Sequence, residues 1–233
     1  MNKPRKTSDY AKVTSSKRPP CNYNSKSERI RLKKIVDLVG TCGRILDLGC
    51  YDGTLGRLLI KNNEVYGIEI SEKVAEIARL RGLKVKIQCI ESGFDFEDNF
   101  FDCVVAAEVI EHILDTDFFI GEIKRVLKPN GFFVVSTPNT ASLGRRILLL
   151  SGKNPYFEAS FGYPPYSVGH IRFFTKDLLL EYLKHKGFEI IKFTSDVVNV
   201  TPSGRISSAL LATYFPCCGR SLIVKCRNIK GEK

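Results

Sequence analysis

Apolar residues along this chain fall into two alternating patterns. Short, nearly continuous apolar runs that suit buried strands lie near residues 44–48, 64–69, 84–89, 102–106 and 131–136. Between and after these runs, apolar positions recur at helical spacing, which predicts helices near residues 53–62, 72–81, 116–127 and 175–186. Strands that alternate with helices are typical of an α/β fold in which helices cover both faces of a parallel sheet. The pattern therefore predicts a three-layer, doubly wound domain.

Two more strand-like runs, at residues 188–195 and 221–226, complete the pattern. Because no long helix separates them, we expect them to form an antiparallel hairpin at one edge of the sheet. The chain is thus predicted to form a seven-stranded, mostly parallel sheet with an antiparallel edge strand.

The net charge of the chain is +11, and its distribution matters more than its size. A chain of 233 residues that is 43% hydrophobic can bury the core of one α/β domain, and no second domain is required. Residues 35–224 carry 21 basic and 22 acidic side chains, whereas residues 1–26 carry seven Lys or Arg against Asp9 alone. The excess charge is therefore a property of the chain ends.

The N-terminal segment is rich in Lys, Ser, Pro and Asn and has almost no aliphatic side chains. Such a segment cannot offset the entropy of ordering, so we expect a basic, disordered tail over residues 1–26 and a folded domain over residues 27–233. The tail is interpreted as a solubilising segment, as an arm that contacts nucleic acid in a salt-sensitive way, or as a targeting segment. The longest apolar runs, such as 147–150, fall far short of the roughly 18 residues that span a membrane.

The eight cysteines include no C-x-x-C pair. Several fall in predicted strands, where cysteine packs as a small apolar residue. This pattern favours a reducing compartment, with cytoplasmic localisation, over a disulfide framework or a zinc site.

The most informative stretch runs from Arg44 to Gly56 and reads Arg-Ile-Leu-Asp-Leu-Gly-Cys-Tyr-Asp-Gly-Thr-Leu-Gly. It combines a buried strand, a glycine turn and a helix start, an order that aims backbone N–H groups at a ligand. The next apolar strand ends at Glu69, whose carboxylate can accept hydrogen bonds from both hydroxyls of a ribose. The nicotinamide fingerprint requires G-x-G-x-x-G, whereas here Tyr51 stands in place of the middle glycine. The stretch therefore predicts a site for a different nucleoside-bearing cofactor.

This combination resembles class I S-adenosylmethionine-dependent methyltransferases, whose first motif is typically D-x-G-C-G-x-G and whose second motif ends in an acid. The resemblance covers roughly residues 27–226. Its later segments are residues 95–102, 103–112, 125–131, 132–139, 169–175 and 187–190. It implies a Rossmann-like fold, S-adenosylmethionine as the cofactor, and methyl transfer.

The resemblance also assigns residues to the methionyl part of the cofactor. It implies that backbone groups of Gly49, Cys50 and Gly53 surround this part, and that Asp47 orients the turn and meets the ammonium group. Tyr51 departs from the usual glycine, and its ring is expected either over the cofactor or in solvent.

The nucleoside part of the cofactor is assigned in the same way. Glu69, followed by Ile70, is expected at the ribose. Ala106, at the end of the fourth strand, is either a small residue that lets the sulfonium pass close to the backbone or an ordinary packing residue. The residues expected at the adenine are Cys89, Ile90 and Glu91.

The acceptor side is predicted from acidic and histidine residues after the fourth strand. Methyl transfer from a sulfonium is an in-line displacement, and it needs a base only where the acceptor is a neutral hydroxyl or amine. Glu108, Glu111 and His112 have helical spacing and would share one face of a helical turn, and His170 could join them from a later loop.

Three interpretations of these residues stay open. His112, assisted by His170, is a general base or hydrogen-bond donor; or the four residues hold a divalent metal ion and a vicinal diol; or His112 bonds a backbone carbonyl and is structural. The pattern resembles both ubiquinone-pathway O-methyltransferases and small-RNA 3′-terminal 2′-O-methyltransferases, but the second histidine pair of the RNA enzymes is absent. We name His112 and His170 as the catalytic candidates and assign no metal ligand.

The function expected from these observations is transfer of a methyl group to a small-molecule or biosynthetic-intermediate acceptor at oxygen. An RNA 2′-O-methyltransferase and a non-catalytic, S-adenosylmethionine-binding regulatory module are the alternatives. Residues 140–169 hold several aromatic side chains among Gly and Pro, and they are interpreted as a lid over a planar or sugar-like acceptor or as a core-packing loop.

Overall fold

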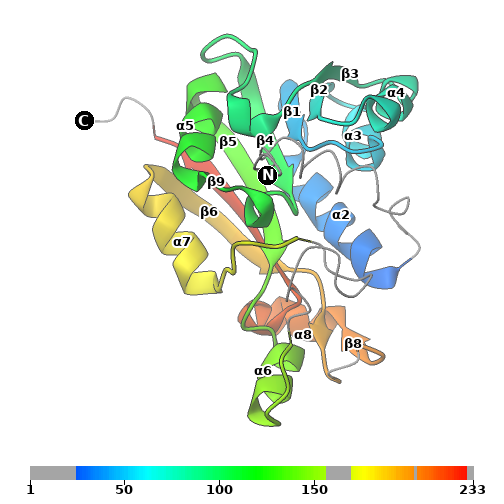
Figure 1. Ribbon diagram of the computed structural model, residues 1–233, viewed down its shortest axis with the longest axis vertical. Helices are drawn as coiled ribbons and strands as arrows, with labels where there is room; N and C mark the ends of the chain where they lie inside the picture. Colours follow the sequence, from blue (N-terminus) through cyan, green and yellow to red (C-terminus); the bar gives the residue numbers. More distant parts are fainter. Residues whose placement is uncertain (1–24, 156–168, 202–203, 230–233) are drawn as a thin grey trace, which may run out of the picture.

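The computed structural model describes residues 25–155, 169–201 and 204–229, and a seven-stranded sheet lies at its centre (Figure 1). The strands are β1 (Arg44–Leu48), β2 (Glu64–Glu69), β3 (Lys84–Ile87), β4 (Phe101–Ala107), β5 (Leu127–Pro138), β6 (Phe188–Ser195) and β9 (Ser221–Asn228). Their order in the sheet is β3, β2, β1, β4, β5, β9, β6, and the first five are parallel to one another. The predicted α/β, doubly wound sheet is confirmed.

The antiparallel part of the sheet lies at one edge, as predicted. Strand β9 runs antiparallel to both of its neighbours, β5 and β6. Strand β6 is outermost, so the later strand of the pair lies between β6 and the parallel strands.

Helices cover both faces of the sheet and complete three layers (Figure 1). On one face lie α2 (Lys26–Val39), α3 (Thr54–Leu59) and α4 (Glu72–Leu80), and on the other lie α5 (Thr116–Val126) and α7 (Lys176–His185). Side chains of the strands alternate between these layers. In β1, Ile45 packs with the first group of helices, whereas Leu46 and Leu48 pack with the second.

Helix α2 is an element that the sequence analysis did not predict. The side chain of Ser25 caps it by accepting a hydrogen bond from the backbone N–H of Glu28, at 3.2 Å. Its buried residues, spaced three or four apart, are Leu32, Ile35, Leu38 and Val39. The helix begins one residue before the predicted domain start, and residues 1–24 of the predicted tail lie outside the described residues.

Two predicted elements are shorter in the structure. Helix α3 ends at Leu59 because the side-chain amide of Asn63 donates to the carbonyl of Leu59 and so closes its last turn. Strand β3 ends at Ile87 because the side chain of Gln88 bonds the loop that follows, at the carbonyl of Gly93.

A group of small elements lies beyond one end of the sheet, at the bottom of Figure 1. These elements are α6 (Leu143–Leu150), β7 (Val198–Asn199), β8 (Ser207–Ser208), α8 (Ala209–Tyr214) and the 3₁₀ turn η3 (Pro216–Cys218). Among the described residues, no helix is both long and apolar enough to cross a membrane.

The sheet topology locates the place where a ligand is expected. Strands β2 and β3 follow β1 on one side, and β4 and β5 lie on its other side. In such doubly wound sheets, ligands bind outside the carboxyl ends of the strands at this switch in direction. Asp47, near the end of β1, and the residues after β4 meet at this point because β1 and β4 are paired there.

Candidate functional site

The turn after β1 has the backbone shape that its motif predicts, although one glycine is missing. Gly49 and Gly53 have φ angles of 62° and 77°, in the left-handed region that favours glycine. Tyr51, in the place of the usual glycine, is also left-handed, with a φ of 50°. Its backbone N–H donates to Oε2 of Glu69 at 3.1 Å, which stabilises this conformation. Tyr51 therefore has the left-handed backbone conformation that a glycine adopts without strain.

Close packing around the turn, together with left-handed φ angles, disfavours side chains at its two glycines. A Cβ on Gly53 would lie 2.9 Å from the Cα of Ala78 in α4. A Cβ on Gly49 would lie 3.1 Å from the side chain of Val109, which follows β4. The turn thus packs against α4 and against the segment after β4, which carries Glu111 and His112.

Glu69 is buried at the end of β2 and organises the same turn. Besides the bond from Tyr51, its Oε1 accepts hydrogen bonds from the backbone N–H groups of Ile70 and Ser71, both at 2.9 Å. These bonds hold the carboxylate at the carboxyl end of the sheet, in the position where the sequence predicts a ribose contact.

Asp47 is buried beside Glu69, and the pKa of its carboxyl group is raised. Burial, and then the neighbouring carboxylate of Glu69, raise the pKa of Asp47 from 3.8 to about 7. Among the described residues, its Oδ2 atom has no hydrogen-bond partner. A buried acid in this condition is best stabilised by a cationic ligand group.

The residues expected at the adenine lie just beyond β3. Cys89 precedes the 3₁₀ turn η1 (Ile90–Ser92), which carries Ile90 and Glu91. Oε1 of Glu91 accepts a hydrogen bond from the backbone N–H of Leu114 at 2.7 Å, so this carboxylate ties η1 to the segment after β4.

Ala106 is completely buried and belongs to the core cluster beneath α5 and α7. Its side chain is therefore a packing residue, whereas its backbone pairs with Leu48 of β1 beside the motif turn.

Glu108 does not join the other acceptor-side residues, which corrects the expectation of one shared helical face. Its φ angle is 58°, so the backbone turns away from a helical path directly after β4. Its carboxylate forms an ion pair with Arg31 at 3.1 Å and accepts a hydrogen bond from the hydroxyl of Ser136 at 3.0 Å. The 3₁₀ turn η2 (Ile110–His112) begins two residues later.

Arg31 is a site residue that the sequence analysis missed. Although burial alone would lower it, the carboxylates of Glu108 and then Asp196 raise the pKa of Arg31. Arg31 falls one turn before Ile35 on the buried face of α2, and this helical spacing is the signal that could have placed it.

Asp196, which follows β6, is a second residue that the sequence analysis missed. Its carboxyl group is completely buried, and burial raises its pKa although Arg220, 3.7 Å away, opposes the shift. Its Oδ1 accepts a hydrogen bond from the backbone N–H of Ser221 at 2.9 Å, which fixes it against β9. Because its charge also raises the pKa of Arg31, Asp196 belongs to the same charged network as Arg31 and Glu108.

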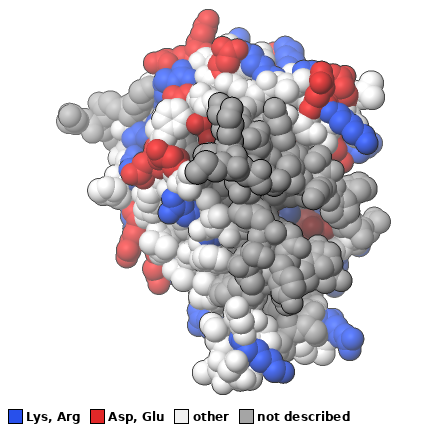
Figure 2. Space-filling model, viewed as in Figure 1, with Lys and Arg blue, Asp and Glu red and all other residues white. Residues whose placement is uncertain are grey.

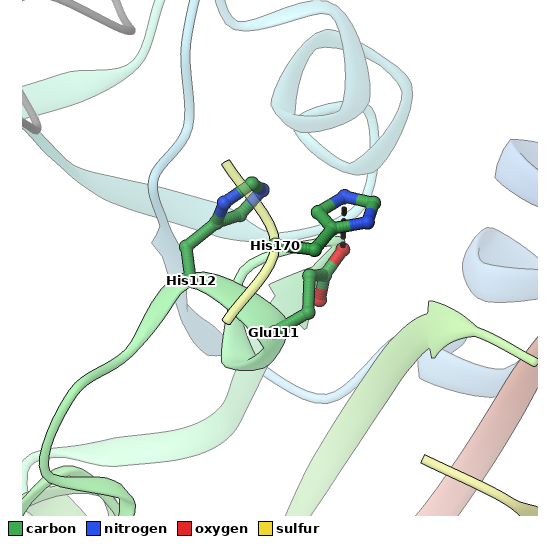
Figure 3. Close-up of side chains that lie close together, drawn as sticks. All are labelled: Glu111, His112 and His170. Atoms are coloured by element: carbon green, nitrogen blue, oxygen red, sulfur yellow. Dashed lines mark ion pairs between the residues drawn. The ribbon is translucent and has the colours of Figure 1, made fainter. Parts of the chain in front are cut away.

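Glu111, His112 and His170 form a compact cluster (Figure 3). One ligand-type atom from each lies within 4.8 Å of the others, and Nε2 of His170 lies 3.9 Å from Oε1 of Glu111. The other carboxylate oxygen of Glu111 accepts a hydrogen bond from the hydroxyl of Thr137 at 3.0 Å. The structure therefore brings together both predicted catalytic histidines and one of the two predicted glutamates.

Main-chain bonds bring His170 to this cluster from a distant part of the chain. The carbonyl of Glu111 accepts hydrogen bonds from the N–H groups of Ile171 and Arg172, at 2.9 and 3.1 Å. Nδ1 of His112 lies 3.2 Å from the carbonyl of Gly169 and donates to it in one tautomer, so that Nε2 is the atom able to accept a proton.

The predicted lid falls mostly outside the described residues. Its aromatic side chains lie within residues 156–168, which the structure does not describe. Arg145 and Arg146 of the same segment lie in α6, where Arg145 donates to the carbonyl of Asn139 at 3.0 Å.

Comparison with known proteins tests the family. A family model described as a methyltransferase domain matches residues 23–192, a range that contains β1 to β5 and every site residue named in the sequence analysis. The chain belongs to the class I S-adenosylmethionine-dependent methyltransferases. S-adenosylmethionine is the cofactor of this family, and the resemblance read from the sequence is confirmed.

Curated relatives of this methyltransferase match over part of their length. The ubiquinone biosynthesis O-methyltransferase of Pelagibacter ubique (strain HTCC1062) is 34% identical over 101 residues, which cover 41% of this chain and 42% of that protein. The match thus spans less than half of the relative.

Solved structures share the fold of this methyltransferase at low sequence identity. The N-methyltransferase NodS from Bradyrhizobium japonicum WM9, in complex with S-adenosyl-L-homocysteine, has a TM-score of 0.64 and 16% identity, with 95% of this chain and 98% of that chain covered. The [4+2]-cyclase SpnF has a TM-score of 0.60 and 21% identity, with 87% of this chain and 82% of that chain covered. Because one neighbour is a cyclase, the fold alone does not determine the reaction.

Proposed function

We propose that this methyltransferase transfers the methyl group of S-adenosylmethionine to a hydroxyl oxygen of a small molecule. The observation that carries this proposal is the cluster of Glu111, His112 and His170, which follows β4 and adjoins the motif turn through Val109 and Gly49. A neutral hydroxyl needs a base to take its proton as it is methylated, and the imidazoles of this cluster can act as one. The name of the O-methyltransferase of Pelagibacter ubique supports the same acceptor atom.

The cofactor side of the proposal uses the turn after β1. Asp47 would meet the ammonium group, because a cation relieves the burial of its carboxyl group. Glu69 would accept hydrogen bonds from the ribose hydroxyls while it holds the turn, with the adenine beside the backbone of η1. The turn residues that would surround the methionyl part are Gly49, Cys50, Tyr51 and Gly53. The residues that would flank the nucleoside and the sulfonium are Ile70, Cys89, Ile90 and Ala106.

On the acceptor side, the proposal concerns where the hydroxyl proton of the acceptor goes. The acceptor oxygen attacks the methyl carbon, the carbon–sulfur bond breaks, and its electron pair stays on sulfur as the sulfonium becomes a neutral thioether. The hydroxyl proton passes to an imidazole nitrogen of His112 or His170. Glu111 stabilises the resulting imidazolium, since Oε1 of Glu111 lies 3.9 Å from Nε2 of His170.

The same donor set also fits a divalent metal ion, which we propose as the alternative way to activate the hydroxyl. Two imidazoles and one carboxylate suit a first-row transition metal ion better than calcium. Glu111, His112 and His170 would hold the ion, and it would lower the pKa of a hydroxyl bound to it.

Acceptor screening with S-adenosylmethionine labelled in its methyl group tests the proposal. Phenols and vicinal diols are compared with primary amines and with RNA, each with and without a chelator. Label in the hydroxyl compounds alone is the expected result. Label in amines or RNA contradicts the proposed acceptor, and cofactor binding without transfer to any acceptor class indicates a binding module instead.

The chelator arm decides between the two means of activation. A metal-dependent enzyme loses activity with the chelator and recovers it with added Mn²⁺ or Zn²⁺. An enzyme with a histidine base is unaffected. For substitutions of His112 or His170, the matched control is His185→Gln, because this exposed histidine lies at the end of α7, outside the cluster.

A further inference from the structure

The elements beyond the end of the sheet form a lobe with an unusual surface. We call residues 143–155 and 198–218 the distal lobe; it contains α6, β7, β8, α8 and η3. Helices α6 and α8 both pack against β7, so these short elements form one unit (Figure 1).

Large apolar side chains are concentrated on the outside of the distal lobe. Eighteen are exposed among the described residues, and eight of these lie in the distal lobe, which holds about a sixth of those residues. The most exposed are Leu150 at the end of α6, at 89%, and Tyr214 and Leu210 of α8, at 72% and 68%. Ile206, before α8 in the chain, and Phe215, directly after it, are also exposed. Single exposed apolar residues are ordinary, but so many on one small group of packed elements indicate an interaction surface.

The charge of the distal lobe has one sign. Its sequence contains no Asp or Glu, while it contains Arg145, Arg146, Lys153 and Arg205. Arg146, Lys153 and Arg205 are exposed. At the lower end of the face drawn in Figure 2, Lys and Arg atoms lie among uncharged ones, and no Asp or Glu is visible there.

We propose that the distal lobe docks on the surface of a lipid bilayer that contains anionic lipids. Leucine and aromatic side chains that enter the boundary between headgroups and acyl chains, flanked by Lys and Arg that meet anionic headgroups, are the features of interfacial membrane binding. This docking lays the lobe on the membrane and requires no spanning helix.

Charge complementarity favours a bilayer over the other occupants. In a symmetric contact between two copies, the same patch faces itself, so four basic side chains would meet four more with no acid between them. Nucleic acid would satisfy the charges, but its phosphate backbone offers nothing to exposed apolar side chains such as Leu150, Leu210 and Phe215.

Vesicle sedimentation with the full chain tests the proposal. The protein should sediment with vesicles of phosphatidylcholine and phosphatidylglycerol, less with phosphatidylcholine alone, and less at high salt. The double variant Leu150→Glu, Leu210→Glu should lower the partition coefficient at least about tenfold, because two apolar contacts become charged ones. Leu80→Glu is the matched control, since Leu80 ends α4 on another part of the molecule and is 88% exposed. It should leave partitioning unchanged.

A fluorescent variant reports insertion directly. The chain has no tryptophan, so Leu150→Trp introduces a single one, whose emission is followed by exciting above the absorption of tyrosine. Its emission should shift to the blue on mixing with anionic vesicles, and that of Leu80→Trp should not. This readout is independent of methyl transfer, so its failure is distinct from failure of the proposed function.

Three results would overturn the proposal. The first is no sedimentation with anionic vesicles. The second is binding that persists in the double variant but is lost when the basic side chains within residues 1–24 are changed to Gln in the full chain; these are Lys3, Arg5, Lys6, Lys12, Lys17 and Arg18. The third is a dimer, seen by light scattering, that Leu150→Glu dissociates while lipid binding is absent.

Discussion

The cofactor side and the acceptor side of this site balance their buried acids in different ways. On the cofactor side, Asp47 is buried beside Glu69, and its pKa is raised to about 7. On the acceptor side, Glu108 pairs with Arg31 and Glu111 lies beside His170. The first arrangement is favourable only once a cation arrives, whereas in the second Glu108 is already paired with the guanidinium of Arg31.

The two sides also differ in how the chain builds them. Asp47, the turn and Glu69 lie within 23 residues of continuous sequence. The acceptor side brings Arg31 of α2 and His170 of a late loop to the segment after β4. We therefore expect substitutions on the cofactor side to act on ligand affinity and on its pH dependence, and those on the acceptor side to act on turnover.

The largest effect is expected at the histidines. His170→Gln and His112→Gln should each lower turnover by roughly 10²- to 10⁴-fold, the usual contribution of a general base, and leave the Kd for S-adenosylmethionine unchanged. Turnover of the labelled cofactor and calorimetry measure the two quantities, with His185→Gln as control. Full turnover in both variants would show that this cluster is structural and would remove the contrast between the two sides.

Asp47→Asn should raise the free energy of unfolding of the ligand-free protein, by an amount that depends on pH. The pKa of Asp47 is about 7 in the folded state, against an ordinary value of 3.8. Between these pH values the folded state keeps the proton and the unfolded state has lost it, so the stability of the wild type falls as the pH rises through this range. The variant should therefore have a free energy of unfolding higher by about 2–4 kcal/mol near pH 8, with little change near pH 4.

Urea unfolding at the two pH values measures this effect. Cofactor binding adds a second test, since an ammonium group beside Asp47 should expel its proton. Calorimetry near neutral pH, in buffers with different ionisation enthalpies, should detect proton release with the wild type and not with Asp47→Asn. Equal stability changes at both pH values would contradict the raised pKa.

Glu69→Gln should weaken cofactor binding by about 1–3 kcal/mol, since it removes a charged acceptor of hydrogen bonds from the ribose and from the turn. Calorimetry with S-adenosylhomocysteine gives the change in Kd. Glu72→Gln is the control, because this exposed carboxylate begins α4 three residues later. An unchanged Kd for Glu69→Gln would mean that the nucleoside lies elsewhere.

The smallest effect is expected at the ion pair that joins α2 to the acceptor side. Arg31→Met and Glu108→Gln should show a coupling free energy of about 1–2 kcal/mol in a double-mutant cycle of urea unfolding, because both side chains are largely buried. Arg29→Met, on the exposed face of the same helix, should show none. Additive effects of Arg31→Met and Glu108→Gln would mean that the acceptor side is no better balanced than the cofactor side.

The prediction from sequence succeeded where neighbouring residues determine the structure. The five parallel strands were predicted because each is an apolar run between turns. The motif turn was predicted because its glycines lie close together in the sequence and the next strand ends in an acid, Glu69. Helix α2 was missed because its charged residues were grouped with those of the basic tail, although the spacing of Leu32, Ile35 and Leu38 indicates a helix.

By itself, the sequence determined the α/β fold, the methyltransferase family and the turn between β1 and α3, because periodicity and contiguous motifs specify local backbone geometry and burial. Tertiary structure alone decided that Glu108 turns to Arg31, that Glu111 and His170 meet, and that α6 and α8 pack against β7 in one lobe. Those contacts join segments far apart in the chain. Sequence spacing does not contain their distances, because they depend on how the sheet and its connections pack in space.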